Sequence, residues 1–274
     1  AVHQVLIWII LFLLDCGMRS FACLVLCFLG VSAWFQPPVR STWQWQLEGV
    51  IENRFNVSVY DVDLYNTHQS TIDSLHAAGH KVVCYYSAGT YEPDRPDSNE
   101  FPESVLGNPV IGWPGEKWLD IRQLDVLGPI MVNRTIIAQS KQCDGLEPDN
   151  VDGYANPTGF PLTYQDQISY NTFIANISHA YQLGVALKND VEQIPDLVDL
   201  VDFTVNEQCH QYNECEALQP FIKQNKAVFQ CEYFEDGSTP DTVCPESNKQ
   251  GLSTIIKTLD LRAIPLYECL TEYT

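Results

Sequence analysis

Short runs of β-branched and aromatic residues alternate with stretches of helical spacing along most of this 274-residue chain. We predict strands at residues 43–47, 57–64, 81–87, 118–121, 145–150, 185–189, 203–207 and 227–233, and helices at residues 71–78, 130–139, 168–181, 215–224 and 248–258. Gly79, Gly184 and Asn225 follow helical stretches, where a left-handed residue commonly ends a helix. Strand–helix repeats are typical of parallel sheets. Eight such strands predict a closed (β/α)8 barrel of the α/β class.

The composition is that of one large acidic domain. A hydrophobic fraction of 45% can fill a single core, and we assign residues 34–274 to the barrel. The chain has 15 Lys and Arg against 35 Asp and Glu, for a net charge of −20. Binding to nucleic acid requires cations that neutralise phosphates, so a nucleic-acid partner is excluded. The acidic balance favours either general solubility or a cationic substrate.

Residues 1–33 have the pattern of a leader. Met18, Arg19 and Ser20 precede an apolar run, and small residues end it at Ala33, as in a signal peptide spanning residues 18–33. The earlier apolar run at residues 5–14 is too short to span a bilayer. We therefore expect a secreted protein, free of the membrane once the leader is cleaved. A single uncleaved membrane anchor is the alternative.

Three sequence motifs agree with secretion. Asn56, Asn133 and Asn176 each begin an Asn-x-Ser/Thr triplet that can accept an N-linked glycan. Such triplets also arise by chance, so glycosylation at these positions is an expectation that depends on the leader.

Seven of the ten cysteines lie outside the leader, so at least one thiol stays unpaired. Cys209 and Cys215 flank a short polar loop and are candidates for a local disulfide. Cys244 and Cys269 are candidates for a second disulfide that ties down the C-terminal region.

The other cysteines are harder to assign. Cys84 lies inside an apolar strand pattern, so we expect a buried free thiol there. Cys143 and Cys231 stay ambiguous. No pair of cysteines has C-x-x-C spacing and no histidine pair accompanies them, so we expect no metal site.

The acid-rich stretch at residues 144–152 carries the strongest chemical signal. Glu147 and Asp149 end a predicted strand, and Glu207 ends another. Carboxylates at strand ends lie where barrel enzymes hold their active sites, and glycoside hydrolysis uses two of them. The alternative is a polar or calcium-binding loop, but its ligand spacing does not match that of an EF-hand.

Other polar and aromatic residues follow the predicted strands toward the same mouth. Residues two apart share a face of a strand, so Asp61 and Asp63 should point the same way, as should Glu147 and Asp149. We expect Trp43 and Tyr85 to stack on a sugar ring. The candidate substrate-binding residues are Trp43, Asp61, Asp63, Tyr85, Glu147, Lys188, Asn189 and Glu232.

Five motifs occur in an order that resembles a known family. They are WQWQL at residues 43–47, VCYYSAG at 83–89, EPDNVDGY at 147–154, LKND at 187–190 and NEQC at 206–209. Together they resemble glycoside hydrolase family 114, the endo-α-1,4-polygalactosaminidases, over residues 43–269. The resemblance implies a secreted barrel enzyme that cleaves α-1,4-linked galactosamine polymers.

The same resemblance implies Asp149 and Glu207 as the catalytic carboxylates. We expect Glu207 to be the acid and Asp149 the nucleophile or base, without a cofactor and in a monomer. A polymer of free galactosamine is a polycation, which an acidic cleft attracts. The alternatives are a hydrolase of another α-glycan and a non-catalytic glycan-binding barrel.

Overall fold

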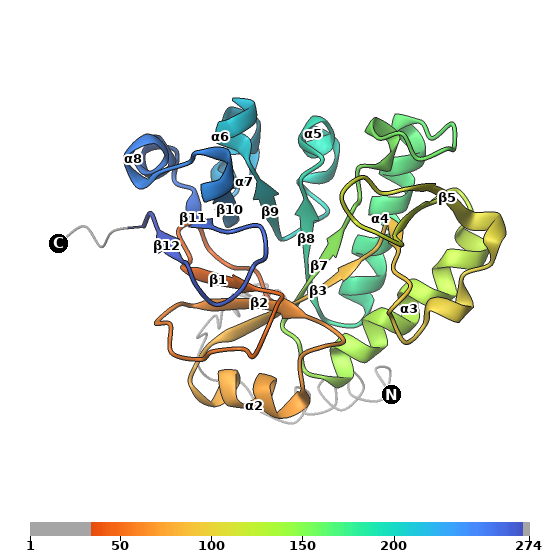
Figure 1. The fold of residues 1–274 in the computed structure, drawn as a ribbon, viewed down its shortest axis with the longest axis horizontal. Helices are drawn as coiled ribbons and strands as arrows, with labels where there is room; N and C mark the ends of the chain where they lie inside the picture. The colour runs from red at the N-terminus through yellow and green to blue at the C-terminus, as the bar shows by residue number, and fades with distance from the viewer. Residues whose placement is uncertain (1–33, 271–274) are drawn as a thin grey trace, which may run out of the picture. The chain divides into compact units, whose positions relative to one another are not determined.

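The computed structural model describes residues 34–270, so the predicted leader lies outside the described part of the chain. Eight parallel strands curl into the predicted (β/α)8 barrel, with the helices around them (Figure 1). The parallel strands are β1 (Trp43–Gln46), β2 (Val59–Asp63), β3 (Lys81–Ser87), β7 (Gly145–Asp149), β8 (Gly184–Lys188), β9 (Phe203–Glu207), β10 (Val228–Tyr233) and β11 (Ser253–Lys257). A short strand β12 (Tyr267–Glu268) pairs antiparallel with β11.

The helices connect these strands. They are α2 (Gln69–Ala77), α3 (Leu124–Ser140), α4 (Tyr164–Ala180), α5 (Ile194–Leu197), α6 (Cys209–Tyr212), α7 (Gln219–Lys223) and α8 (Pro240–Gln250). Among residues 34–270, none is long and apolar enough to cross a membrane. Asn56, Asn133 and Asn176 are all exposed.

Two strand predictions are wrong, although the total of eight is right. Residues 118–121 do not form a barrel strand. Strand β6 (Lys117–Leu119) pairs antiparallel with β4 (Thr90–Tyr91) and β5 (Leu106–Pro109), in an insertion between β3 and α3. Residues 253–257, which we predicted to be helical, form β11. Helix α8 ends before them, because Gly251 adopts a positive φ of 79°.

A positive φ marks the chain after two other helices as well. Gly79 has a φ of 93° and Asn225 one of 58°, as expected of residues that end a helix. Gly184 instead begins β8, and Gln182 takes the left-handed conformation before it.

The barrel has two apolar layers that follow from strand alternation. One cluster fills the interior and includes Trp43, Phe203 and Phe229. The other lies between the sheet and the helices and includes Val82, Cys84 and related even-numbered positions of β3. Inward-facing residues are therefore apolar near the strand starts, and the charged residues Glu147 and Lys188 lie further along the strands.

Side-chain hydrogen bonds join the first and last parallel strands. The indole of Trp43 donates to the carbonyl of Ser253 at 2.8 Å, and the ammonium of Lys257 donates to Oε1 of Gln44 at 2.8 Å. Gln44 in turn donates to the carbonyl of Ala263 at 3.0 Å. These bonds hold β1 against β11 and the segment that follows it.

Three disulfides cross-link the barrel. Cys209 is joined to Cys215, and Cys244 to Cys269. The predicted free thiol at Cys84 is wrong, because Cys84 is bonded to Cys143 across 59 residues of sequence. Cys84 lies on the helix-facing side of β3, next to the turn that leads into β7, and an apolar strand pattern does not show such a neighbour.

Among residues 34–270 the unpaired cysteine is Cys231, which is fully buried in the barrel interior. We predict that the oxidised protein of residues 34–274 gives no reaction with a thiol reagent when folded and one thiol per chain in denaturant. The measurement is a thiol titration without reductant, with Cys231→Ser as the control that should give none. Three thiols in denaturant would contradict the pairing of Cys84.

Candidate active site

The ammonium group of Lys188 is the centre of the polar interior. Its Nζ lies 3.0 Å from Oε1 of Glu147, 3.0 Å from Oδ1 of Asp149 and 3.2 Å from Oε2 of Glu207. Burial alone would lower the pKa of Lys188, but the neighbouring carboxylates raise it well above its usual value. Lys188 is therefore a permanent cation between three acids from two strands, β7 and β9.

Asp149, at the end of β7, receives hydrogen bonds on both carboxylate oxygens. The backbone N–H of Asn150 donates to Oδ1 at 2.8 Å, and the hydroxyl of Tyr85 donates to Oδ2 at 3.1 Å. The side-chain amide of Asn150 adds a bond to Oδ2 at 3.2 Å. With Lys188, four donors surround this carboxylate and fix its orientation.

Glu207, at the end of β9, has fewer partners. Besides Lys188, the hydroxyl of Tyr233 donates to its Oε1. Its backbone N–H donates to Oδ1 of Asn189 at 2.8 Å, which fixes the strand end. The Glu207 side chain is 25% exposed, against 0% for Glu147, so Glu207 faces the open cavity.

Glu147 and Asp61 are more deeply buried than Asp149 and Glu207. The indole of Trp45 donates to Oε2 of Glu147 at 3.1 Å. Burial raises the pKa of Glu147 to about 7 despite Lys188. Burial and the adjacent Glu147 raise the pKa of Asp61 well above its usual value. Both shifts favour the neutral forms of these carboxyls, which reduces the negative charge around Lys188.

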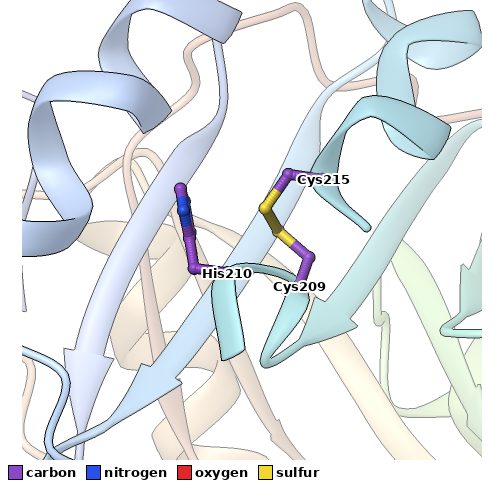
Figure 2. Close-up of side chains that lie close together, drawn as sticks. All are labelled: Cys209, His210 and Cys215. Atoms are coloured by element: carbon purple, nitrogen blue, oxygen red, sulfur yellow. A yellow bond between two sulfur atoms is a disulfide. The ribbon is translucent and has the colours of Figure 1, made fainter. Parts of the chain in front are cut away.

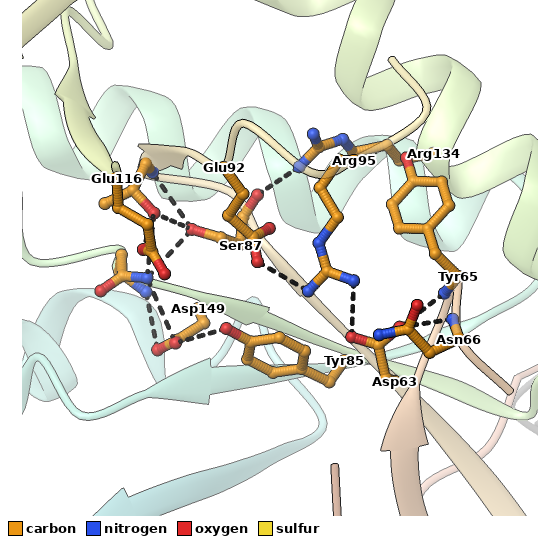
Figure 3. Close-up of polar contacts among 12 residues, drawn as sticks. Asp63, Tyr65, Asn66, Tyr85, Ser87, Glu92, Arg95, Glu116, Arg134 and Asp149 are labelled. Atoms are coloured by element: carbon orange, nitrogen blue, oxygen red, sulfur yellow. Dashed lines mark hydrogen bonds and ion pairs between the residues drawn. The ribbon is translucent and has the colours of Figure 1, made fainter. Parts of the chain in front are cut away.

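A second polar network lines the mouth on the side of β2 and β3 (Figure 3). Arg95 pairs with Asp63 at 2.7 Å and with Glu92 at 2.6 Å. The other oxygen of Asp63 accepts the backbone N–H groups of Tyr65 and Asn66 at 2.8 and 2.7 Å. Asp63 thus shapes the loop after β2.

The end of β3 is held by a buried arginine. Arg134 of α3 makes two bonds to Asp97, at 2.7 and 2.9 Å, and donates to the carbonyl of Ser87 at 2.5 Å. The hydroxyl of Tyr65 also donates to Asp97 at 2.8 Å. This pair fixes the insertion against β3, so the loop above the mouth has a defined position.

A cavity of about 550 Å³ opens at these strand ends. Of the predicted site residues, Asp63, Tyr85, Asp149, Lys188, Asn189 and Glu207 line it. Four others are not among its lining residues. Asp61 and Glu147 lie beneath it, and Trp43 is buried, 1% exposed, in the barrel interior. Glu232 accepts the backbone N–H of His210 at 2.9 Å and stabilises the start of α6.

The cavity also contains residues that we did not select as site residues. They include Trp45, Glu92, Arg95, Trp113, Glu116, Trp118 and Tyr233. Trp45 could have been chosen over Trp43, because it lies two residues nearer the strand end on the same face. Trp113 and Glu116 lie in the insertion, where no strand periodicity indicates which side chains face the cavity.

Cys209, His210 and Cys215 form a cluster with the residue types of a metal site. The two sulfur atoms are bonded to each other, with His210 beside them (Figure 2). A disulfide offers no thiolate to a metal ion. His210 instead bonds to the hydroxyl of Ser247 at 2.7 Å, and burial lowers its pKa. This cluster therefore stabilises the fold between β9 and α8.

A barrel with acidic residues paired across its carboxyl end and an open cavity above them is the architecture of a glycoside hydrolase. The model of glycoside hydrolase family GH114 matches residues 29–272. The chain belongs to this family and is a glycoside hydrolase.

Solved structures agree with this assignment. Ega3 of Aspergillus fumigatus, crystallised in complex with galactosamine, is 39% identical with a TM-score of 0.82, covering 86% of this chain and 97% of that chain. The glycoside hydrolase domain of PelA from Pseudomonas aeruginosa shares the fold, at 12% identity and a TM-score of 0.61 over 82% of this chain and 96% of that one. No curated protein matches the sequence.

The buried acids predict that the folded protein is most stable in acid. Burial raises the pKa of Glu147 and Glu116 to about 7, that of Asp152 to about 6 and that of Asp190 to about 8. The folded state therefore retains protons that the unfolded chain has lost, and stability falls as pH rises from about 4 to 8. We expect a higher melting temperature at pH 5 than at pH 7.5.

Thermal unfolding followed by circular dichroism at both pH values tests this expectation. Asp190→Asn is the matched variant, because Asn tolerates the left-handed conformation of this residue and removes one titrating group outside the cavity. The variant should lose stability less steeply with pH. A melting temperature that rises from pH 5 to pH 7.5 would contradict the pKa directions.

Proposed function

We propose that the protein is a secreted, endo-acting hydrolase of α-1,4-linked galactosamine polymers, with Asp149 and Glu207 as its catalytic residues. The observation that carries the proposal is the contact of both carboxylates with the single ammonium of Lys188, at the floor of the cavity. The substrate class is supported by the 39% identity to Ega3, which was crystallised with galactosamine. The net charge of −20 suits a polycationic substrate.

The hydrogen-bond partners of Asp149 and Glu207 support a different catalytic role for each carboxylate. Asp149 has four donors, which hold its carboxylate in a fixed orientation as a nucleophile requires. Glu207 has two donors and is the general acid, giving its proton to the glycosidic oxygen as that bond breaks. When Asp149 becomes bonded to the sugar its negative charge is lost, which favours the carboxylate of Glu207 as the base for water.

Other observations support secretion. Three disulfides need an oxidising compartment to persist. The three predicted glycosylation sites are exposed. We propose a monomer that acts outside the cell, possessing no dedicated cofactor.

Loss of either carboxylate should remove activity. We predict that Asp149→Asn and Glu207→Gln each reduce turnover by about 10²- to 10⁴-fold. The measurement is reducing-end release from α-1,4-galactosamine polymer by residues 34–274, with Asp94→Asn at an exposed position as the control that keeps full activity.

Substrate controls separate the alternatives. Starch and chitosan are tested beside the galactosamine polymer. Cleavage of starch or chitosan instead would favour a hydrolase of another glycan. A folded wild type that cleaves nothing but binds the polymer would favour a non-catalytic barrel. Full activity in either carboxylate variant would contradict the catalytic assignment.

The separation of the two carboxylates predicts the stereochemistry. The facing oxygens of Asp149 and Glu207 contact the same nitrogen at 3.0 and 3.2 Å, so they cannot be further apart than the sum of these lengths. Two carboxyl groups that share one ammonium lie close together, which favours the roughly 5 Å separation of retaining enzymes over the roughly 6.5 Å or more of inverting enzymes. We therefore predict retention, which early proton NMR spectra of the cleaved oligosaccharide would show as an α-anomer. An initial β-anomer would contradict it.

A further inference from the structure

The hairpin between β5 and β6 carries an exposed tryptophan into the cavity. Residues 110–116 form a tight turn, in which the N–H of Val110 donates to the carbonyl of Glu116 at 3.0 Å and the N–H of Glu116 donates to that of Trp113 at 3.2 Å. Gly112 and Gly115 adopt positive φ values of 88° and 92°, which permit this turn. Trp113 is 61% exposed and lines the cavity.

Two carboxylates line the same cavity without full charge compensation. Glu116 lines the cavity, and its nearest polar partner is the hydroxyl of Thr90 at 3.3 Å; no basic side chain within residues 34–270 makes an ion pair with it. Glu92 pairs with Arg95 through Oε1, but its Oε2 is buried without a hydrogen-bond partner in the described part of the chain. Burial, and next the negative charge of Glu92, raise the pKa of Glu116 to about 7.

This acidic pair is connected to the catalytic centre. The side-chain amide of Asn150 lies 3.2 Å from Oδ2 of Asp149 and 3.3 Å from the hydroxyl of Thr90, which in turn bonds to Glu116 (Figure 3). The approach is close because residue 89 is glycine: a Cβ there would lie 1.6 Å from the carbonyl oxygen of Asn150. Glu116 is therefore linked to the proposed nucleophile through Thr90 and Asn150.

We propose that the hairpin forms an amino-sugar subsite next to the catalytic pair, in which Trp113 stacks on the sugar ring and Glu116, assisted by Glu92, binds the ammonium group. The inference rests on the proposed function and adds to it the residues that select a free amine. An indole supplies a large, rigid apolar surface for a sugar face. A cation completes the hydrogen bonding of both carboxylates, which no group of residues 34–270 does.

The subsite predicts discrimination between free and acetylated amines. An N-acetyl group carries no charge, so it leaves the buried carboxylates uncompensated and costs the desolvation of Glu116. The stacking contact with Trp113 does not depend on the amine. The two residues should therefore differ in what their loss changes: Glu116 sets the preference for the free amine, and Trp113 the affinity for the chain.

The test measures kcat/KM for free and N-acetylated α-1,4-galactosamine oligosaccharides with wild type, Glu116→Gln and Trp113→Ala. Glu116→Gln should lose about 10- to 100-fold on the free amine, because a charged hydrogen bond is replaced by a neutral one, and should lose most of the preference over the acetylated chain. Trp113→Ala should raise KM about tenfold for long chains with kcat nearly unchanged, because it removes binding away from the bond that breaks.

Two surface variants of the same insertion are the controls. Glu103→Gln removes an acid whose side chain is 89% exposed outside the cavity, and Ile111→Ala removes an apolar side chain that is 86% exposed on the same hairpin. Calorimetric titration in an Asp149→Asn background gives the affinities directly. If wild type cleaves the polymer and Glu116→Gln keeps the preference of Glu103→Gln, the subsite is wrong and the proposed function stands. If wild type neither binds nor cleaves galactosamine chains, both are wrong.

Discussion

One buried ammonium group determines how many acids this barrel can hold at its mouth. Lys188 contacts three carboxylates within 3.2 Å and lies 4.8 Å from the centre of the Trp45 ring, which excludes water from its lower side. An unpaired buried charge is costly, so the cation and the acids require one another. Strand alternation makes the arrangement possible, since Glu147 and Asp149 both point inward from β7. The aromatic layer beneath them excludes the water that would otherwise screen these charges.

The chemistry of the mouth divides into two electrostatic regions. Around Lys188, positive charge and hydrogen-bond donors compensate the acids and fix their orientation. Around Glu92 and Glu116, the acids exceed the local cations, with Arg95 serving Asp63 and Glu92 together. The first region suits bond cleavage, which needs ionised groups held in place. The second suits recognition of a cation, which needs unsatisfied negative charge.

Sequence patterns were sufficient for the fold class and for the strand ends that carry Asp149, Lys188 and Glu207. They failed where the local sequence does not show which strands and side chains are adjacent in the fold. The run at residues 118–121 has the composition of a barrel strand, but its partners lie in the same insertion, and the β-branched run at residues 253–257 was merged with the helix before it. Trp43 and Trp45 are the same residue type on the same face of β1. Only their position along the strand decides that Trp43 is buried in the interior and that Trp45 lines the cavity. Cys84 could not be paired with Cys143 without knowing which strands are adjacent.

The side-chain bonds between β1 and β11 also bear on how the chain folds as it is made. Trp43 and Gln44 are synthesised more than 200 residues before their partners Ser253, Lys257 and Ala263. Until then the indole of Trp43 and the amide of Gln44 lack the acceptors that the closed barrel supplies. Lys188 and its three acids can come together before that point. The part of the barrel that β11 forms is then still missing. Barrel closure is thus a late step with a large loop to close, and the nascent chain exposes its aromatic interior until the final strand arrives.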